Sequence, residues 1–173
     1  MNRFLTLCLM SLAALCAGAH EADPEKILNY VPIDASLTTS GQVHPMHIPI
    51  IEREAFELVI NLAVADQERN LEESFHITDK GISYVQIPVV WENPTQGDLD
   101  LFFAVMDARK DRNTLVHCFA NYRASAFTYL YRVLREGVPE AEARKKLEAV
   151  WNEEAFEEYP QWRTFIDSAL GSQ

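Results

Sequence analysis

A cysteine and an arginine close together in the chain are the side chains of this sequence best suited to chemistry. Cys118 and Arg123 enclose four residues, Phe119, Ala120, Asn121 and Tyr122. A loop between a strand and a helix presents backbone N–H groups and the positive end of the helix dipole to an anion. The same field favours the thiolate form of a cysteine, and a planar guanidinium can hold two oxygens of a tetrahedral anion. The spacing therefore predicts an anion site with a nucleophilic thiol.

Two elements must hold this loop in place. The apolar residues before Cys118 predict a short strand over residues 114–117, which ends at His117. Apolar residues then recur at helical spacing and predict a helix that begins near Ala124, with one face formed by Phe127, Leu130, Val133 and Leu134. The alternative interpretation is a buried structural cysteine beside an unrelated arginine, because free cysteines are among the most buried residues.

Strands and helices alternate along the rest of the chain. We expect further strands at residues 31–39, 56–62 and 84–90, and Pro88 indicates an edge strand or a strand end. Helices are expected near residues 51–55, 65–74, 98–109, 140–151 and 161–170. This order predicts an α/β three-layer sandwich with a central, mostly parallel sheet. Ligands usually lie at the carboxyl ends of such strands, where Cys118, Trp91 and Glu92 all fall.

The first 19 residues have the pattern of a signal peptide. Arg3 precedes an apolar run over residues 4–15, which is short for a membrane span, and an Ala-Gly-Ala cleavage signal ends at Ala19. We therefore expect cleavage near Ala19 and a periplasmic or secreted protein. Residues 20–173 would form one domain, with additional helices from about residue 138.

The cysteine count supports a functional thiol. Cys8 and Cys16 would leave with the signal peptide, so Cys118 would have no partner in an oxidising compartment. A lone exported cysteine is either inert through burial or retained for its thiol chemistry, and its position at a strand end favours the latter. A lipid anchor at Cys16 is an alternative, although Leu15 is bulky for that motif.

The charge of the chain limits its partners. It has 15 basic and 26 acidic residues and a formal net charge of −11. That balance argues against nucleic acid and against anionic membrane surfaces as partners, and we expect no membrane span in the exported chain. An anionic substrate must therefore be attracted by a local positive site. The oligomeric state cannot be predicted from these features.

Four segments together resemble a known superfamily. They are Thr39-Ser40-Gly41-Gln42, Val59-Ile60-Asn61-Leu62, Tyr84 with Ile87-Pro88-Val89, and His117-Cys118 with Arg123. In this order they resemble cysteine-dependent tyrosine and dual-specificity phosphatases. Within that superfamily the chain is most similar to the bacterial beta-lactamase-hydrolase-like phosphatases, which also place four residues between cysteine and arginine. The resemblance covers roughly residues 30–136 and implies a dual-specificity-phosphatase-like fold.

The resemblance also implies a mechanism and its residues. Cys118 would form a phosphocysteine, while Arg123 and the loop amides would bind the phosphate oxygens. The family's general acid is an aspartate on the loop after the Ile-Pro strand. In that loop Glu92 is the first candidate here, and Asp98 is the second, with helix N-cap as its alternative role. No metal or cofactor is implied, and the substrate would be a phosphorylated small molecule, lipid or peptide.

The loop departs from the family pattern at two positions. The usual glycine is missing, and Asn121 is the residue best able to adopt a left-handed conformation in its place. Ala124 stands where a hydroxyl normally follows the arginine, and Ser125 comes one residue later. These departures leave open a catalytically weak or inactive phosphate-binding module.

Two further alternatives remain from the sequence. A rhodanese-type sulfurtransferase would also use a cysteine, a short loop and an arginine, and would carry a persulfide on Cys118.

His44 and His47 have a spacing that can begin a zinc site or line the substrate cleft. His117 is expected to form a hydrogen bond beneath the loop, or else to be an ordinary core histidine.

Overall fold

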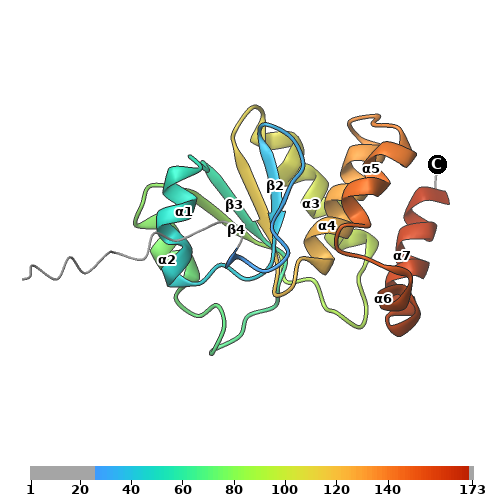
Figure 1. Cartoon of the computed structure of the whole chain (residues 1–173), viewed down its shortest axis with the longest axis horizontal. Coiled ribbons are helices and arrows are strands. Elements are labelled where there is room, and N and C mark those ends of the chain that lie inside the picture. Colours follow the sequence, from blue (N-terminus) through green and yellow to red (C-terminus); the bar gives the residue numbers. More distant parts are fainter. Residues whose placement is uncertain (1–25, 172–173) are drawn as a thin grey trace, which may run out of the picture.

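A computed structural model describes residues 26–171 as an α/β protein built on one five-stranded sheet (Figure 1). The predicted signal peptide, residues 1–19, lies outside the described residues. The strands are β1 (Val31–Pro32), β2 (Leu37–Ser40), β3 (Leu58–Asn61), β4 (Ser83–Gln86) and β5 (Thr114–His117). Their order across the sheet is β1-β2-β5-β3-β4, and all neighbouring pairs are parallel except β1 with β2. The predicted fold class is confirmed.

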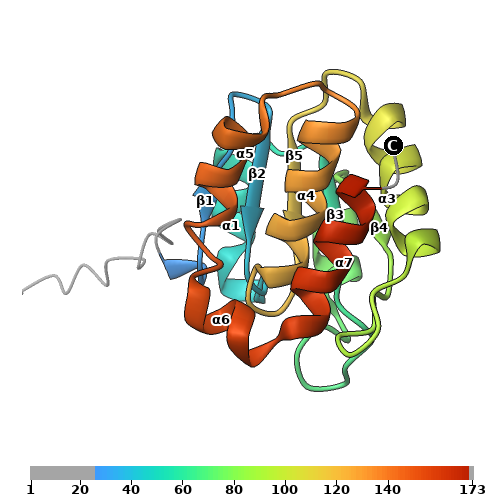
Figure 2. The ribbon, with the colours of Figure 1, turned by 90° about the vertical axis from the view of Figure 1, so that its right-hand side faces the viewer.

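Helices cover both faces of the sheet. The 3₁₀ helix η2 (Pro45–His47) leads into α1 (Ile48–Arg53), which lies with α2 (Glu73–Thr78) on one face, as Figure 1 shows. The opposite face carries α3 (Gln96–Arg109) and α4 (Tyr122–Leu134). Three C-terminal helices pack around α4 on its outer side (Figure 2): α5 (Glu140–Leu147), α6 (Glu153–Glu158) and α7 (Pro160–Gly171).

The alternation of side chains along the central strands creates two cores. Val59 of β3 and Leu115 of β5 point into a smaller cluster beneath α1 and α2. Ile60 and Val116, the next residues along, belong to the larger cluster that contains α3, α4 and the C-terminal helices. Because both faces are covered, these strands are continuously apolar, as parallel strands usually are.

The carboxyl ends of four strands meet in one row. His117 of β5 pairs with Ser40 of β2 on one side and with Asn61 of β3 on the other. Asn61 in turn pairs with Gln86 of β4. The Cys118 loop begins one residue beyond this row, so the fold places it among the chain segments that leave β2, β3 and β4.

The predicted helix over residues 65–74 is wrong. Its residues form turns, and α2 begins only at Glu73. Asp66 accepts hydrogen bonds from the backbone N–H groups of Glu68 and Arg69, at 3.0 and 2.9 Å. Asn70 accepts a bond from Asp66 N–H and donates one to the carbonyl of Val64. These local side-chain bonds satisfy the backbone in a loop and so compete with helix formation.

Other boundaries also differ from prediction. The segment expected as one strand over residues 31–39 is two antiparallel strands joined by a turn in which Asp34 accepts from Ser36 N–H. The helix after the cysteine starts at Tyr122 rather than Ala124, and the helix predicted over residues 140–151 ends at Leu147.

Strand β4 and helix α3 show the effect of single residues. β4 lies at the sheet edge and ends at Gln86, just before Ile87-Pro88, as Pro88 indicated. Helix α3 begins at Gln96 with Thr95 as its N-cap, so Asp98 is not the N-cap but the third helical residue of a capping box.

None of the described helices is long and apolar enough to span a bilayer.

Candidate active site

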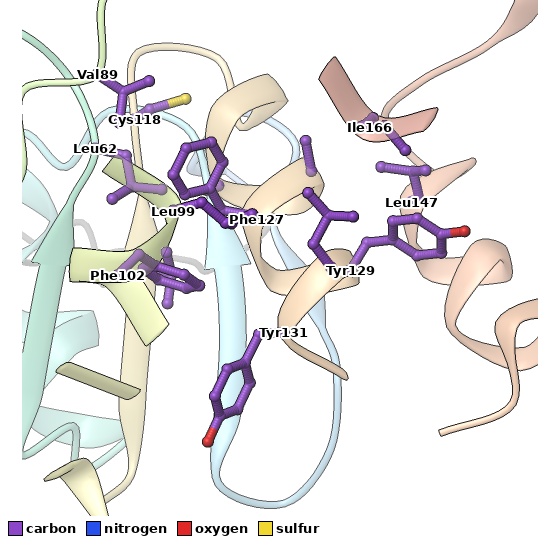
Figure 3. Close-up of a cluster of buried hydrophobic side chains, with 14 of the residues drawn as sticks. Leu62, Val89, Leu99, Phe102, Cys118, Phe127, Tyr129, Tyr131, Leu147 and Ile166 are labelled. Carbon is purple, nitrogen blue, oxygen red and sulfur yellow. The ribbon is translucent and has the colours of Figure 1, made fainter. Parts of the chain in front are cut away.

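Cys118 lies directly beyond the end of β5. Its N–H donates to the carbonyl of Ser40 at 3.3 Å. The residue is 1% exposed, and it belongs to the same buried cluster as Leu62, Val89 and Phe127 (Figure 3). The sulfur therefore sits at the deep end of the loop, at the border between the apolar core and the strand ends.

The loop backbone is held from outside by the segment around β2. The carbonyl of Phe119 accepts from Gln42 N–H at 3.1 Å, and the carbonyl of Ala120 accepts from Asn29 Nδ2 at 3.0 Å. In a trans peptide the C=O and the following N–H point in opposite directions. Because the Phe119 carbonyl points outward to Gln42, the N–H of Ala120 points to the inner side of the loop.

Gly41 explains why the Thr-Ser-Gly-Gln segment accompanies the cysteine loop. Its N–H donates to the carbonyl of Leu28 at 2.7 Å, and it forms a bridge with Ala120. A Cβ at this position would lie 2.8 Å from the Leu28 carbonyl oxygen and 3.2 Å from that of Phe119. Only glycine allows this close approach of three backbone segments.

Asn121 takes the conformation that the missing glycine would have taken. Its φ is 70°, in the left-handed region, and it is the N-cap of α4. Its side-chain Nδ2 donates to the carbonyl of Asn29 at 2.6 Å and to Thr39 Oγ1 at 3.0 Å. The expectation that Asn121 replaces glycine is confirmed, and two hydrogen bonds stabilise the strained residue.

Arg123 is buried beside the loop. It lies in the first turn of α4 and is 6% exposed. Its guanidinium carbon is 5.1 Å from the ring centre of Trp91 and 5.8 Å from that of Phe119. Among the described residues nothing pairs with its buried Nε. A buried guanidinium donor without a partner is costly, so this group is available for an anion.

A buried carboxylate that the sequence reasoning missed lies on the other side of the loop. Glu73, in the first turn of α2, has its Oε1 2.6 Å from Nε2 of His117. Its Oε2 accepts from Gln42 Nε2 at 2.7 Å and from Asn61 Nδ2 at 3.4 Å. The side chains of His117 and Glu73 are 0% and 3% exposed. The imidazole N–H is not well aligned, so this is a close polar contact rather than a straight hydrogen bond.

Tyr84 completes this buried polar cluster. Its hydroxyl accepts from Asn61 Nδ2 at 2.9 Å. Burial raises the pKa of Tyr84, and the neighbouring Glu73 carboxylate adds to that shift. Tyr84 and Asn61 both belong to motifs on which the resemblance was based, so a partner for Asn61 could have been sought in the sequence. The position of Glu73 could not, because the helix begins at Glu73 and not near Ala65 as predicted.

An aromatic cluster borders the loop on the α4 side. The ring of Trp91 packs among those of Tyr122, Trp151, Tyr159 and Trp162, with centroid distances of 4.8 to 6.2 Å. Trp162 Nε1 donates to the carbonyl of Trp91, and Trp151 Nε1 donates to that of Tyr122, each at 3.0 Å. Helix α7 therefore holds the Trp91 segment, and the segment between α5 and α6 holds the start of α4.

The two candidate acids lie in different surroundings. Asp98 Oδ2 accepts from Thr95 N–H at 3.1 Å and from Thr95 Oγ1 at 2.7 Å, so its carboxylate is engaged in the helix cap. Glu92 is exposed and lines a hollow with Gln161 and Phe165 of α7. The structure thus brings Cys118, Arg123 and His117 together, and it places Glu92 on the neighbouring Trp91 segment.

The remaining predicted residues have local partners. The Ser125 hydroxyl donates to the carbonyls of Asn121 and Tyr122, at 2.8 and 3.1 Å, within the first turns of α4. His47 is buried, and its Nδ1 accepts from His44 N–H at 3.1 Å. Burial lowers the pKa of His47, and the nearby His44 lowers it further. Within residues 26–171 no cluster of three or more His, Cys, Asp or Glu side chains could hold a metal.

Comparison with known proteins identifies the family. No protein-family model and no curated protein matches the chain. A solved structure from Shewanella putrefaciens CN-32, a DUF442 protein described as a candidate phosphatase, is 33% identical, with a TM-score of 0.74. The match covers 84% of this chain and 90% of that one. The chain belongs to the DUF442 family. Its predicted resemblance to cysteine-dependent phosphatases is thereby confirmed.

Solved structures of lower sequence identity share the fold of this chain. TpbA from P. aeruginosa is 14% identical, with a TM-score of 0.68 over 87% of this chain and 90% of its own. The core catalytic domain of the PP-IP phosphatase SIW14 from S. cerevisiae is 15% identical, with a TM-score of 0.64 over 80% and 83% of the two chains. The three-layer architecture is therefore that of cysteine-based phosphatases.

Proposed function

We propose that this DUF442 protein is an exported phosphatase that hydrolyses phosphate monoesters through a phosphocysteine on Cys118. The observation that carries the proposal is the buried, unpartnered Nε of Arg123 beside a loop whose Ala120 N–H points inward. Together with the N-terminus of α4, these donors suit an oxyanion with several oxygens. Cys118 is the nucleophile at the deep end of that loop.

The reaction has two steps. In the first, the Cys118 thiolate attacks phosphorus, and an S–P bond forms while the P–O bond to the leaving group breaks. An acid transfers a proton to the departing oxygen. In the second, water attacks the phosphocysteine while the resulting carboxylate takes its proton. The S–P bond then breaks and releases phosphate and the thiolate. Arg123 and the loop amides stabilise the charge on the equatorial oxygens in both steps.

Glu92 is the better candidate for the acid. The Asp98 carboxylate already accepts two hydrogen bonds from Thr95, whereas Glu92 is exposed on the segment that Trp91 anchors near Arg123. An acid matters most when the leaving oxygen is a poor leaving group. Glu92→Gln should therefore slow alkyl phosphates more than aryl phosphates. Equal slowing of both, or none, would argue against Glu92, and Asp98→Asn is the matched comparison.

The substrate would be a phosphorylated peptide, small molecule or lipid. A structure of TpbA in complex with pTyr contains a phosphorylated aromatic ligand in the same fold. Here the half-buried rings of Phe119 and Tyr122 border the anion loop, so an aryl phosphate is the first substrate to test. We propose a periplasmic or secreted location on the basis of residues 1–19, and an N-terminus near His20 on the exported protein would support it.

One observation favours a second candidate, a phosphate-binding module without turnover. Ser125 donates its hydroxyl to two backbone carbonyls of α4, and Ala124 has no hydroxyl to offer. Cys118 is also almost fully buried. In this case the loop and Arg123 would still bind phosphate, but the thiol would not react.

The decisive experiment is hydrolysis of p-nitrophenyl phosphate under reducing conditions, with the Cys118→Ser variant beside the natural protein. Turnover that needs Cys118, requires no added metal and is inhibited by vanadate supports the phosphatase. If turnover is absent but vanadate still raises the melting temperature, the binding module is supported instead. Turnover that survives in Cys118→Ser would refute the covalent mechanism.

A further inference from the structure

We propose that Glu73 is a positioning residue for the thiol, and that it acts through His117. The proposal rests on the proposed function for its effect on turnover, whereas its effect on the thiol can be measured without turnover. Glu73 lies on α2, in a part of the chain that none of the family motifs includes. Its Oε1 is 2.6 Å from Nε2 of the histidine that precedes Cys118.

Glu73 determines where the imidazole of His117 carries a proton. A nitrogen and an oxygen at 2.6 Å would repel each other if both presented lone pairs, so the contact favours a proton on Nε2, although that N–H is not aligned for a straight hydrogen bond. Glu73 therefore selects a form of His117 that carries a proton on Nε2. Both side chains are shielded from water, which strengthens this selection.

The Glu73 carboxylate is itself held in place by neighbouring side chains. Its other oxygen accepts from Gln42, just beyond β2, and from Asn61 at the end of β3. Glu73 thus connects the segments on both sides of β5. A buried ion pair adds little to stability compared with an apolar group of the same volume. Stability alone therefore does not explain a charged residue at this position.

The pair of Glu73 and His117 is connected to the Cys118 sulfur through the chain. His117 is bonded to Cys118 through one peptide, and Glu73 lies beyond His117, on the side of α2. Positive charge that Glu73 stabilises on His117 lies one residue from the thiol, where it favours a negative charge. The oriented pair favours the thiolate, and Arg123 adds positive charge from the α4 side.

Other titratable or charged groups also lie near the pair. Tyr84 faces Glu73 from β4, as its raised pKa reflects. The hollow beside Glu73 is also lined by His44, Glu68, Arg69 and Glu72. Of these, Glu72 is the useful control, because its side chain is 76% exposed and it lies 3.7 Å from His76 rather than beside His117.

The experiment compares Glu73→Gln with Glu72→Gln. Each removes one negative charge from adjacent positions of the chain. The thiolate of Cys118 is followed by its ultraviolet absorbance across pH, as the difference from the same protein carrying Cys118→Ser. We expect Glu73→Gln to lose thiolate absorbance at neutral pH and to regain it at higher pH. Glu72→Gln should match the natural protein, and an unchanged profile in a folded Glu73→Gln protein would overturn the proposal.

Kinetics give a second readout. Carboxylates that orient metal-bound histidines are typically worth about 10- to 100-fold in affinity or activity, and we take that as the scale for this pair. We expect Glu73→Gln to lower kcat for p-nitrophenyl phosphate by a factor in that range, with KM nearly unchanged, because Arg123 is untouched. In a His117→Gln background the same substitution should have no further effect. Full additivity would show that Glu73 does not act through His117.

A measurement on the natural protein covers the case in which Glu73→Gln does not fold. With nitrogen-labelled histidine, the ring signals of His117 are assigned by their loss in His117→Gln. We expect a proton on Nε2 at neutral pH, and a neutral ring with its proton on Nδ1 would overturn the proposal. If the natural protein shows no turnover, the proposed function fails, while the absorbance and nitrogen signals still decide the role of Glu73.

Discussion

The two sides of the Cys118 loop differ in chemistry, because one side is polar and the other is aromatic. On the α2 side, buried polar groups meet in a connected cluster made of Gln42, Asn61, Glu73, Tyr84 and His117. On the α4 side, the neighbours are the rings of Trp91, Tyr122, Trp151, Tyr159 and Trp162. The polar side holds His117 and Glu73 next to the cysteine, whereas the rings on the other side pack around the Trp91 segment and Arg123. The difference suggests that ionisation of the Cys118 thiol and placement of the substrate are controlled from separate faces of the sheet.

The largest expected effect comes from breaking the polar side. His117→Leu leaves the Glu73 carboxylate buried beside Gln42 and Asn61 but without its charged partner. Loss of one member of a buried ion pair costs about 3–5 kcal/mol, so the free energy of unfolding in urea should fall by that amount. His76→Leu is the matched control, because it breaks an exposed pair with Glu72 and should cost about 0–1 kcal/mol. Equal losses in the two variants would contradict the importance of burial.

The aromatic side should respond differently. Trp151→Phe keeps a ring in the cluster but removes the N–H that binds the Tyr122 carbonyl. Because the Ser125 hydroxyl still donates to that carbonyl, the variant loses one hydrogen bond and should lose about 0.5–1.5 kcal/mol of unfolding free energy. Because no charge changes, we expect KM to rise while the thiolate absorbance of Cys118 keeps its pH profile. A shifted profile in this variant would show that the two sides are not separate.

The loop between the two sides can be tested at Asn121. Its left-handed φ of 70° suits glycine better than alanine. Both Asn121→Gly and Asn121→Ala remove the bonds to Asn29 and Thr39, but only alanine adds backbone strain. We expect the alanine variant to be less stable than the glycine variant by about 1–2 kcal/mol in urea unfolding. Equal stability would mean that the loop relaxes to another conformation.

The smallest effect is a pH dependence on the polar side. Burial and the Glu73 charge raise the pKa of Tyr84, so the folded state favours the protonated phenol. This contribution to stability is complete below the unfolded pKa of about 10 and is lost as the pH rises above it. Unfolding experiments between neutral and alkaline pH should show a smaller loss for Tyr84→Phe than for the natural protein. A loss of the same size in both would exclude Tyr84 as the source.

Local patterns in the sequence were enough to predict the reactive loop. The apolar run before His117, the helical spacing after Arg123 and the alternation of elements predicted β5, α4 and a mostly parallel sheet. Asn121 was identified because few residues tolerate a left-handed conformation. Such predictions succeed because strand and helix periodicity, and the φ preference of single residues, depend on neighbours in the chain.

Only the tertiary structure showed which distant groups meet at the loop. Glu73 begins a helix that was predicted to start near residue 65, because side-chain bonds from Asp66 and Asn70 keep the preceding residues in turns. Its contact with His117 depends on α2 packing beside β4 so that the Glu73 side chain reaches the ends of β3 and β5, and no local pattern encodes that. The aromatic contacts of Trp151 and Trp162 also join segments far apart in the sequence. Thus the sequence by itself determined the reacting loop, while packing across the sheet decided which charges and rings surround it.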